Sequence, residues 1–460
     1  MKDKSGGISV SVPYEIAAIR PLRETNVRER EEALKKAHFN TELIPQDMVY
    51  VDLKSDSGVS PLITPQVAAM IGVGALEGAP ELAREVHGGL ALLSKHFQEI
   101  FGYPFVVPCT QGRAAERIWT RTCIRDGSVV PGNMLFPSTR FHIESSGAKV
   151  VEVISEKAYE LFSDDPFKGN VDVEKLEAVV KENGREKVAC VYVELCVNSC
   201  GGHPVSMANL REIKRYLQRH GIPLFLDASR ILENSYFIQR REEGYRSRAI
   251  RAIVLETCSH ADACTLSAQK DLMVREGGFI GIRDEKSYQR AYFQAFLDGA
   301  QPSRPALAGL EVSLRELLQS DRYAAGREEQ VIHLWTKLAD KGVPVLHPPG
   351  GHGVFIDARA FLPVVPPQSH PAEALAAYIY SVSGVRATKG PPLTHSQTAR
   401  GIELLRLAVP AHRYLQGHMD DVADAVLFAF SHRGEIRGLK RIEREGRSKY
   451  DPPLFTPLES

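Results

Sequence analysis

The sequence predicts an α/β fold built on a mostly parallel sheet with crossover helices. Two apolar runs, Val188–Leu195 and Ile222–Asp227, flank a predicted helix from 207 to about 220 that Ser206 can cap. A third apolar run, Ala261–Thr265, follows further along the chain. Strand, helix and strand joined by short links are typical of a parallel sheet. We therefore expect ligands beyond the carboxyl ends of these strands.

Size and composition limit the possible classes of protein. The 460 residues suffice for two domains, and 43% hydrophobic with 25% charged residues is ordinary for a globular chain. Lys+Arg and Asp+Glu both total 57, so no net field favours nucleic acid or an anionic membrane. The sequence has no membrane-spanning run, no apolar signal core at its start, and an odd number of cysteines, seven. These features favour the cytoplasm.

We expect an N-terminal arm (1–50), a large domain (51–315) and a small C-terminal domain (316–460). The arm carries one charged helix, and the segment 238–257 is predicted to be a solvated helix. Other predicted helices cover 80–101, the 290s, 310–341, 372–383 and about 418–432. Further predicted strands are Val49–Leu53, the run from Phe105, Gly277–Ile282, Val343–Leu346, Val354–Asp357 and Leu404–Val409.

Lys270 and Asp227 suggest a cofactor. Lys270 lies between two strand-like runs, where a solvated lysine is unusual, and Asp227 ends an earlier strand. An acid that keeps a pyridine nitrogen protonated and an amine that forms a Schiff base are the minimal apparatus for pyridoxal phosphate. A surface lysine and a helix-capping aspartate remain the alternatives.

Three further positions have the chemistry of a binding site. The turn Thr110–Gln111–Gly112–Arg113 opens a helix, and free N–H groups there bind phosphate, although an ordinary strand-to-helix turn fits equally. Phe136 can stack on a flat ring or belong to the core. Arg406 lies inside an apolar run, so it needs a substrate carboxylate or a structural ion pair.

We expect no metal site. Cys258, His260 and Cys264 form one candidate group, and Cys196, Cys200 and His203 form another. Neither group has a recognised zinc spacing, and both lie among apolar residues. We interpret these cysteines as buried thiols. The glycine-rich stretch 72–78 likewise matches no nucleotide-binding spacing in the required context.

The longer motifs together resemble the tyrosine phenol-lyase and tryptophanase family of pyridoxal-phosphate β-eliminating lyases. The resemblance covers nearly the whole chain and is closer to tyrosine phenol-lyase. The matching stretches are Asp52–Leu53, Asp56–Gly58, Thr110–Arg113 with Glu116, Gly132–Phe136, Pro166–Gly169, Asn198–Asn209, Asp227–Arg230, Glu233–Ile238, Ser267, Lys270–Asp271, Gly350–His352, Gly384–Arg386, Arg406–Leu407 and His418–Asp420.

The resemblance implies the aspartate-aminotransferase fold (fold type I), usually as a tetramer built from dimers with shared sites. It also implies roles for single residues. Lys270 forms the Schiff base, Asp227 pairs with the pyridine nitrogen, and Arg230 with Asn198 holds the cofactor 3′-oxygen. Phe136 stacks on the ring. The phosphate cradle comprises Gln111, Gly112, Arg113 and Ser267, and the substrate carboxylate is bound by Arg406 with Ser57 nearby.

The departures from the family are concentrated where the leaving group binds. The family tyrosine that protonates the departing ring aligns with Leu76, and a cation-binding glutamate aligns with Gly74. The lysine before the Schiff-base lysine is Gln269, a C-terminal aromatic pair is replaced around Leu454–Phe455, and the arginine for the phenol hydroxyl falls near Lys389. Substitute acids are available at Glu77, Glu81, Glu85 and His87.

These departures predict β-elimination from a β-substituted L-amino acid, giving pyruvate and ammonia, without efficient cleavage of tyrosine or tryptophan. Three alternatives stay open: β-replacement; transamination, decarboxylation or aldol-type cleavage; and a non-catalytic interaction protein of the same fold. The partners we expect are the amino acid and further copies of the chain, as a dimer or tetramer.

Overall fold

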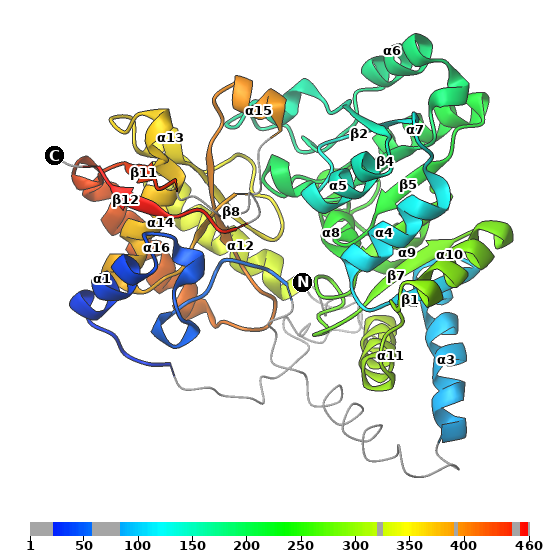
Figure 1. The fold of residues 1–460 in the computed structure, drawn as a ribbon, viewed down its shortest axis with the longest axis horizontal. Helices are drawn as coiled ribbons and strands as arrows, with labels where there is room; N and C mark the ends of the chain where they lie inside the picture. Colours follow the sequence, from blue (N-terminus) through cyan, green and yellow to red (C-terminus); the bar gives the residue numbers. More distant parts are fainter. Residues whose placement is uncertain (1–21, 58–82, 320–324, 391–393, 444–450, 459–460) are drawn as a thin grey trace.

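A seven-stranded sheet forms the centre of the larger part of the molecule (Figure 1). The computed structural model describes residues 22–57, 83–319, 325–390, 394–443 and 451–458. The strand order is β1-β7-β6-β5-β4-β2-β3, and only β7 runs antiparallel to its neighbours. The strands are β1 Phe105–Cys109, β2 Val129–Gly132, β3 Lys149–Glu152, β4 Val191–Glu194, β5 Leu224–Asp227, β6 Ala263–Ser267 and β7 Gly278–Ile282.

Helices cover this sheet, so its central strands are buried on both faces. Strands β2, β4 and β5 have no exposed residue. The helices of this part are α3 Ala83–Phe101, α4 Gly112–Cys123, α5 Pro137–Ser145, α6 Val173–Asn183, α7 Met207–His220, α8 Ile231–Arg241, α9 Ile250–Ser259, α10 Glu285–Leu297 and α11 Arg304–Gln319. The predicted fold class is therefore confirmed.

Local sequence signals set α7 correctly but failed for the segment that follows β5. Ser206 caps α7 by accepting a hydrogen bond from Asn209 N at 3.1 Å. The predicted solvated helix over 238–257 is wrong: α8 ends at Arg241 and α9 begins at Ile250. The chain turns between them at Gly244, with φ +83°, and the first eight residues of α8 are buried. The charged residues at the end of α8 led to the prediction of a solvated helix, although most of α8 is buried.

A second, smaller sheet has the order β8-β10-β9, with all pairs antiparallel. Its strands are β8 Gly353–Asp357, β9 Thr388–Lys389 and β10 Leu404–Ala408, and its helices are α12 Ala325–Ala339, α13 Ala358–Phe361, α14 Pro371–Ser383, α15 His395–Ala399 and α16 Gln416–Ser431. The N-terminal helix α1 Val27–Lys36 and the hairpin β11 Leu439–Arg441 with β12 Phe455–Pro457 lie beside these elements (Figure 1). Short 3-10 turns fill the connections: Thr41–Leu43, Gln46–Met48, Glu156–Tyr159, Arg185–Lys187, Asn198–Cys200, Pro367–Ser369 and Arg433–Glu435.

The predicted strands Val49–Leu53 and Val343–Leu346 are wrong. Each forms one isolated bridge, Asp52 with Arg386 and Val345 with Ile356. Pro344 has no N–H for a ladder, and Asp52 directs its carboxylate to the Arg386 guanidinium, with Oδ2 2.6 Å from Nη2. Apolar composition alone did not supply the partner strands that a ladder requires.

The hydrophobic cores follow the two sheets. One large cluster lies around β4, β5 and β6, and another joins the small sheet with α12, α14 and α16. Val51 and Leu53 belong to the second cluster. The limits 51–315 and 316–460 stay a prediction.

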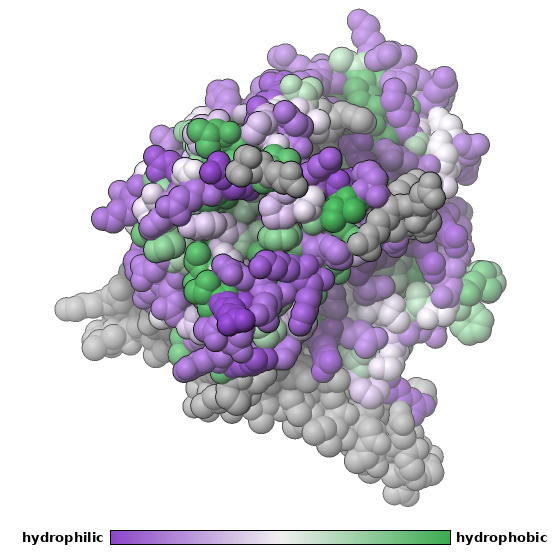
Figure 2. Space-filling view, turned by 60° about the vertical axis from the view of Figure 1, so that its left-hand side comes forward, coloured by the Kyte–Doolittle hydropathy of each residue, from purple (hydrophilic) through white to green (hydrophobic). Residues whose placement is uncertain are grey.

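The molecular surface has mixed polarity on the face shown in Figure 2, where hydrophobic residues are scattered among hydrophilic ones. Within the described ranges, no helix combines the length and the apolar character needed to cross a bilayer. The seven cysteines are free, and all except Cys123 are buried. No cluster of three potential metal ligands occurs among the residues that the structure describes.

Candidate active site

Asp227 and Lys270 lie at the same edge of the large sheet. Asp227 is the last residue of β5, and its register partners are Glu194 on β4 and Thr265 on β6. Lys270 follows three residues after the end of β6. Because these strands are parallel, their carboxyl ends meet at one edge, where α/β sheets bind ligands.

The Lys270 amine is held near charges without being hydrogen-bonded. Its Nζ lies 4.9 Å from the centre of the Phe136 ring, and no hydrogen bond of Nζ occurs within the described part of the chain. Burial and then the Arg230 guanidinium lower the pKa of Lys270, against the opposing effect of Asp227. A lower pKa increases the fraction of neutral amine, which is the nucleophilic form.

Asp227 is oriented by its own turn. Its Oδ1 accepts a hydrogen bond from Ser229 N at 3.0 Å, and Ser229 Oγ accepts one from Ser267 N at 2.9 Å. Asp227 is buried, and Oδ2 has no donor among the described residues. One carboxylate oxygen is thus available for a cationic or N–H group of a ligand.

The N-terminus of α4 faces the end of β6. Gln111 is the N-cap without a side-chain cap bond, and Ala114 N donates to Gln111 O at 3.1 Å. The N–H groups that precede Ala114 in the first turn have no acceptor within the helix. A Cβ at Gly112 would lie 2.5 Å from Ser267 Cβ, so only glycine permits this approach. Gln111 and Arg113 are exposed. The predicted cradle residues Gln111, Gly112 and Arg113 thus lie at a helix start whose Gly112 packs against Ser267, and such a helix start suits an anion.

Arg230 and Asn198, which follow the ends of β5 and β4, are buried. Arg230 Nε donates to Asp56 Oδ2 at 3.2 Å, and this pairing holds the pKa of Asp56 well below its usual range. Asn198 N donates to Glu194 Oε1 at 2.8 Å, whereas Asn198 Nδ2 is buried without a hydrogen-bond partner in the described residues. An unpaired buried donor marks a place where a ligand oxygen fits.

Arg406 extends from β10 to Asn198, which follows β4, and to Lys54. Its Nη1 donates to Asn198 Oδ1 at 3.2 Å and its Nη2 to Lys54 O at 2.8 Å. Its Nε is buried and unpaired, and no carboxylate lies within ion-pair distance in the described residues. The alternative of a structural ion pair therefore finds no partner there. Ser57 follows three residues after Lys54.

Sequence reasoning assigned no role to two buried acids beside Asp227. Burial and the Asp227 charge raise the pKa of Glu194 to about 8 and the pKa of Glu116 to about 7. Ser138 Oγ donates to Glu116 Oε2 at 2.6 Å. Glu194 ends an otherwise apolar strand, and that position was the available signal.

The structure also places three of the departures from the family. Lys389 Nζ lies 3.1 Å from Glu373 and 3.7 Å from Glu403. Leu454 and Phe455 are buried, and Gln269 Nε2 donates to Arg275 O at 2.7 Å. Leu76, Gly74, Glu77 and Glu81 lie outside the described residues, as do the side chains of Glu85 and His87.

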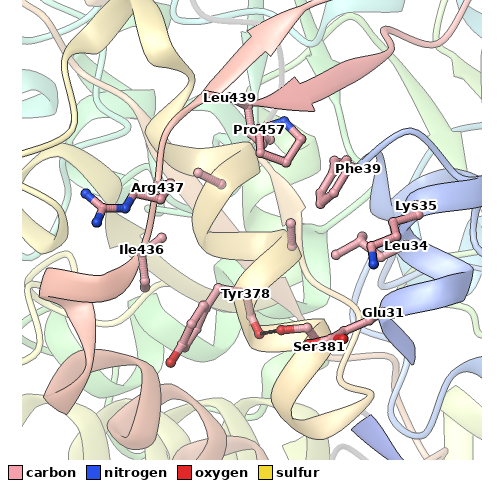
Figure 3. A pocket seen from close by; sticks show the side chains of 12 residues that line it. Glu31, Leu34, Lys35, Phe39, Tyr378, Ser381, Ile436, Arg437, Leu439 and Pro457 are labelled. Carbon is pink, nitrogen blue, oxygen red and sulfur yellow. Dashed lines mark hydrogen bonds between the residues drawn. The ribbon is translucent and has the colours of Figure 1, made fainter. Parts of the chain in front are cut away.

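A separate pocket of about 290 Å³ lies between α1, α14 and the C-terminal hairpin (Figure 3). Leu34, Phe39, Tyr378, Ile436 and Leu439 form most of its apolar wall. The pocket contains none of the predicted site residues. The convergence of buried charged groups, rather than this cavity, identifies the candidate active site.

Known proteins with the same fold include enzymes of different activities. The chain superposes on a threonine aldolase from Leishmania major with a TM-score of 0.59 and 15% identity, covering 83% of this chain and 100% of that one. A serine palmitoyltransferase from Sphingomonas wittichii gives a TM-score of 0.62 at 16% identity, covering 89% and 97%. At such identities the likeness shows the fold alone.

Sequence comparisons are more specific. A tyrosine phenol-lyase from Symbiobacterium sp. (strain SC-1) is 40% identical over 459 residues, covering 97% of this chain and 98% of that protein. The tyrosine phenol-lyase of Pasteurella multocida is 38% identical, with 96% of each chain covered. A family model described as β-eliminating lyase matches residues 52–425. The chain therefore belongs to the β-eliminating lyase family and is a lyase dependent on pyridoxal phosphate.

Proposed function

We propose that this chain catalyses β-elimination from a β-substituted L-amino acid other than tyrosine or tryptophan. The amino acid and one water molecule give pyruvate, ammonia and the protonated β-substituent. The observation that carries the proposal is the free Lys270 amine beside Phe136, at the same sheet edge as Asp227. Transaminases share such a site, but the family match favours elimination.

The residues present fit pyridoxal phosphate. Lys270 would bind the aldehyde covalently, and the free Oδ2 of Asp227 suits a protonated pyridine nitrogen. The unpaired Nδ2 of Asn198 suits the 3′-oxygen, and the first turn of α4 suits the phosphate. When bound, this cofactor supplies an electron sink that makes the Cα proton of an amino acid acidic.

The protein side chains supply positioning and proton transfer. Arg406 offers a buried, unpaired Nε to the substrate carboxylate, a charge-assisted contact that fixes the orientation of Cα. The lowered pKa of the Lys270 amine supports a role for it as the base that would take the Cα proton. Arg230 and Asp56 form a buried pair that keeps a guanidinium beside the site without net charge.

Substrate choice should differ from that of the tyrosine phenol-lyases. Cleaving a bond to an aromatic ring carbon requires an acid to protonate that carbon, and Leu76 aligns with the acid. Lys389 lies near the position where the family has the arginine that binds the phenol hydroxyl. It pairs in register with Leu405, whereas Arg406 pairs with Thr388. Neighbouring positions of a strand point to opposite faces, so Lys389 and Arg406 lie on opposite faces of the small sheet.

The test is to assay tyrosine, tryptophan and S-substituted cysteines side by side, measuring pyruvate and the released group. We expect rapid pyruvate formation from S-substituted cysteines, because a thiolate leaves with little acid help. Phenol release from tyrosine at a comparable kcat/KM would refute the substrate assignment. Amino-group transfer without pyruvate would refute elimination itself.

We also propose that the chain acts as a homo-oligomer in the cytoplasm. Helix α10 exposes a contiguous apolar face comprising Tyr292, Phe293, Phe296 and Leu297, the last three more than half exposed at 61%, 62% and 60%. Such faces mark contacts between proteins. Light scattering on the purified chain tests this assignment, and a monomer at micromolar concentration would contradict it.

A further inference from the structure

His352 connects the two sheets through a hydrogen-bonded chain to which the proposed function assigns no role. It immediately precedes β8, and its ring is fully buried. Nε2 lies 2.8 Å from Asn198 Oδ1, and Nδ1 lies 3.0 Å from Glu233 Oε1 on α8. The imidazole therefore bridges a site residue and a buried acid.

Hydrogen-bond donors and acceptors fix the polarity of this chain. Arg406 can only donate, so the Asn198 atom that it contacts at 3.2 Å is the carbonyl oxygen. The same oxygen faces His352 Nε2, which must therefore carry a hydrogen. If the ring is neutral, Nδ1 is then a bare acceptor and Glu233 must donate. If the ring is charged, Glu233 is the anion. Either way the pair holds one additional proton.

We propose that Glu233 and His352 form a pair that shares one proton and carries no net charge, and that His352 positions the Asn198 oxygen for Arg406. This inference rests on the proposed function, in which Arg406 binds the substrate carboxylate. His352 is a positioning residue, because it acts on the clamp through Asn198.

Burial supports a neutral pair, because it disfavours a charge on either partner. Burial raises the pKa of Glu233 well above its ordinary value and lowers the pKa of His352 well below its own. Arg327 Nη2 donates to the other Glu233 oxygen at 2.9 Å. The titratable and charged groups facing the pair are Arg230, Arg327, Arg406, Asp56, Asp271, Glu328 and Cys196.

The two glycines before His352 make this approach possible. A Cβ at Gly351 would lie 2.1 Å from Glu233 Cγ, and a Cβ at Gly350 would lie 2.0 Å from Gly201 O. On the other side of the ring, a Cβ at Gly202 would lie 2.9 Å from His352 Cε1. The motif Gly350–Gly351–His352 is thus explained by close packing around one imidazole.

The Glu233–His352 pair should strengthen binding of the substrate carboxylate. Because the pair has no net charge, it does not compete with that carboxylate for the Arg406 guanidinium. Asn198 Oδ1 accepts from both His352 and Arg406, so it holds the Arg406 fork in place as a neutral group. Among the described residues, no anion contacts Arg406, and its Nε stays available. A substrate carboxylate would then contact this guanidinium directly, whereas Asp56 and Glu42 act on it only from beyond ion-pair distance.

The first experiment compares ligands with and without a carboxylate. Alanine and ethylamine, neither of which has a leaving group, are titrated into cofactor-loaded protein, and the absorbance change gives the affinity for each. We expect His352→Phe to weaken alanine roughly 10- to 100-fold, as for loss of a hydrogen bond in a charged network. The affinity for ethylamine should change less than about twofold, because ethylamine has no carboxylate for Arg406 to bind. His352→Gln keeps an N–H donor and should recover most of the alanine affinity.

The controls separate the possible failures. His203 is equally buried and has no hydrogen-bond partner for its ring nitrogens in the described residues, so His203→Phe should leave alanine affinity unchanged. Equal weakening of alanine and ethylamine by His352→Phe would reduce His352 to a packing role and overturn the inference. If Arg406→Gln leaves alanine affinity unchanged, the clamp of the proposed function has failed instead.

The shared proton has its own test in cofactor-free protein. Folded wild type holds one proton on the pair, and Glu233→Gln holds none, whereas the unfolded glutamate is ionised above its ordinary pKa. The ratio of unfolding constants, wild type over Glu233→Gln, should rise tenfold per pH unit from pH 5.5 to 8. A ratio independent of pH would overturn the shared proton.

Discussion

Lys168 and Lys270 are both removed from bulk water, yet their surroundings differ. Lys168 is fully buried, and its Nζ donates to the carbonyl oxygens of Glu160, Leu161 and His347. Lys270 Nζ has no hydrogen bond in the described part of the chain and lies over the Phe136 ring. Burial lowers the pKa of both amines. Carbonyl acceptors hold an ammonium in place, whereas an amine without them is available for chemistry.

The largest expected effect separates the two lysines directly. Lys270→Ala should reduce pyruvate formation by about 10⁴-fold or more, because in the proposed function Lys270 is both the covalent attachment and the proton acceptor. The fold should survive, since the amine makes no hydrogen bond among the described residues. Borohydride trapping with pyridoxal phosphate should label wild type but not the variant.

Lys168→Met is the matched exchange. It leaves three buried carbonyl groups without their donor, which should lower the free energy of unfolding by at least about 3 kcal/mol. The folded fraction should retain its kcat. Chemical denaturation measures the first effect, and activity corrected for folded protein measures the second. Loss of activity in a stably folded Lys168→Met would break the comparison.

The second effect concerns Asp227, the acid near Lys270 that counteracts the lowering of the pKa of its amine by burial. Asp227→Ala should lower kcat on the order of 10³-fold, because a developing negative charge on Cα loses its electrostatic support. Asp227→Glu should recover part of the rate. Unchanged kcat in Asp227→Ala would mean that another group protonates the ring nitrogen. Asp262→Ala serves as a control, since Asp262 pairs with Lys214 and accepts from Leu224 N, at the opposite end of β5 from Asp227.

The third effect is a dependence of stability on pH in cofactor-free protein. The folded pKa of Glu194 is raised to about 8, so the folded chain binds a proton that the unfolded chain releases above pH 4.5. Between these values the unfolding free energy should fall with rising pH by about 1.4 kcal/mol per unit from this group. Glu194→Gln should remove that slope, and parallel curves for the two proteins would contradict the raised pKa.

The smallest effect concerns the turn that carries Lys270. Gln269 Nε2 closes this turn by donating to Arg275 O at 2.7 Å. Gln269→Ala should lower the unfolding free energy by about 1 kcal/mol and change kcat less than tenfold. A larger loss of kcat would show that the reactivity of the Lys270 amine depends on the orientation of its turn, and not only on the lack of hydrogen-bond acceptors for Nζ.

Part of the fold followed from local signals. Ser206 caps α7 where the sequence predicted it, and the runs ending at Asp227 and before Lys270 are adjacent parallel strands. Buried strands between crossover helices have few other arrangements. The predicted helix over 238–257 and the strand at Val343–Leu346 failed, because burial and strand pairing depend on distant segments.

The sequence by itself determined the chemistry that is available: an acid at the end of β5, a lysine after β6, a helix start with free N–H groups, and the family to which these belong. Only the tertiary structure decided how that chemistry is tuned. Glu194 and Glu116 acquire raised pKa values from burial beside Asp227, and His352 joins Glu233 to Asn198 across 119 and 154 positions of sequence. Burial and charge interactions depend on distances in space, and no local pattern encodes those distances.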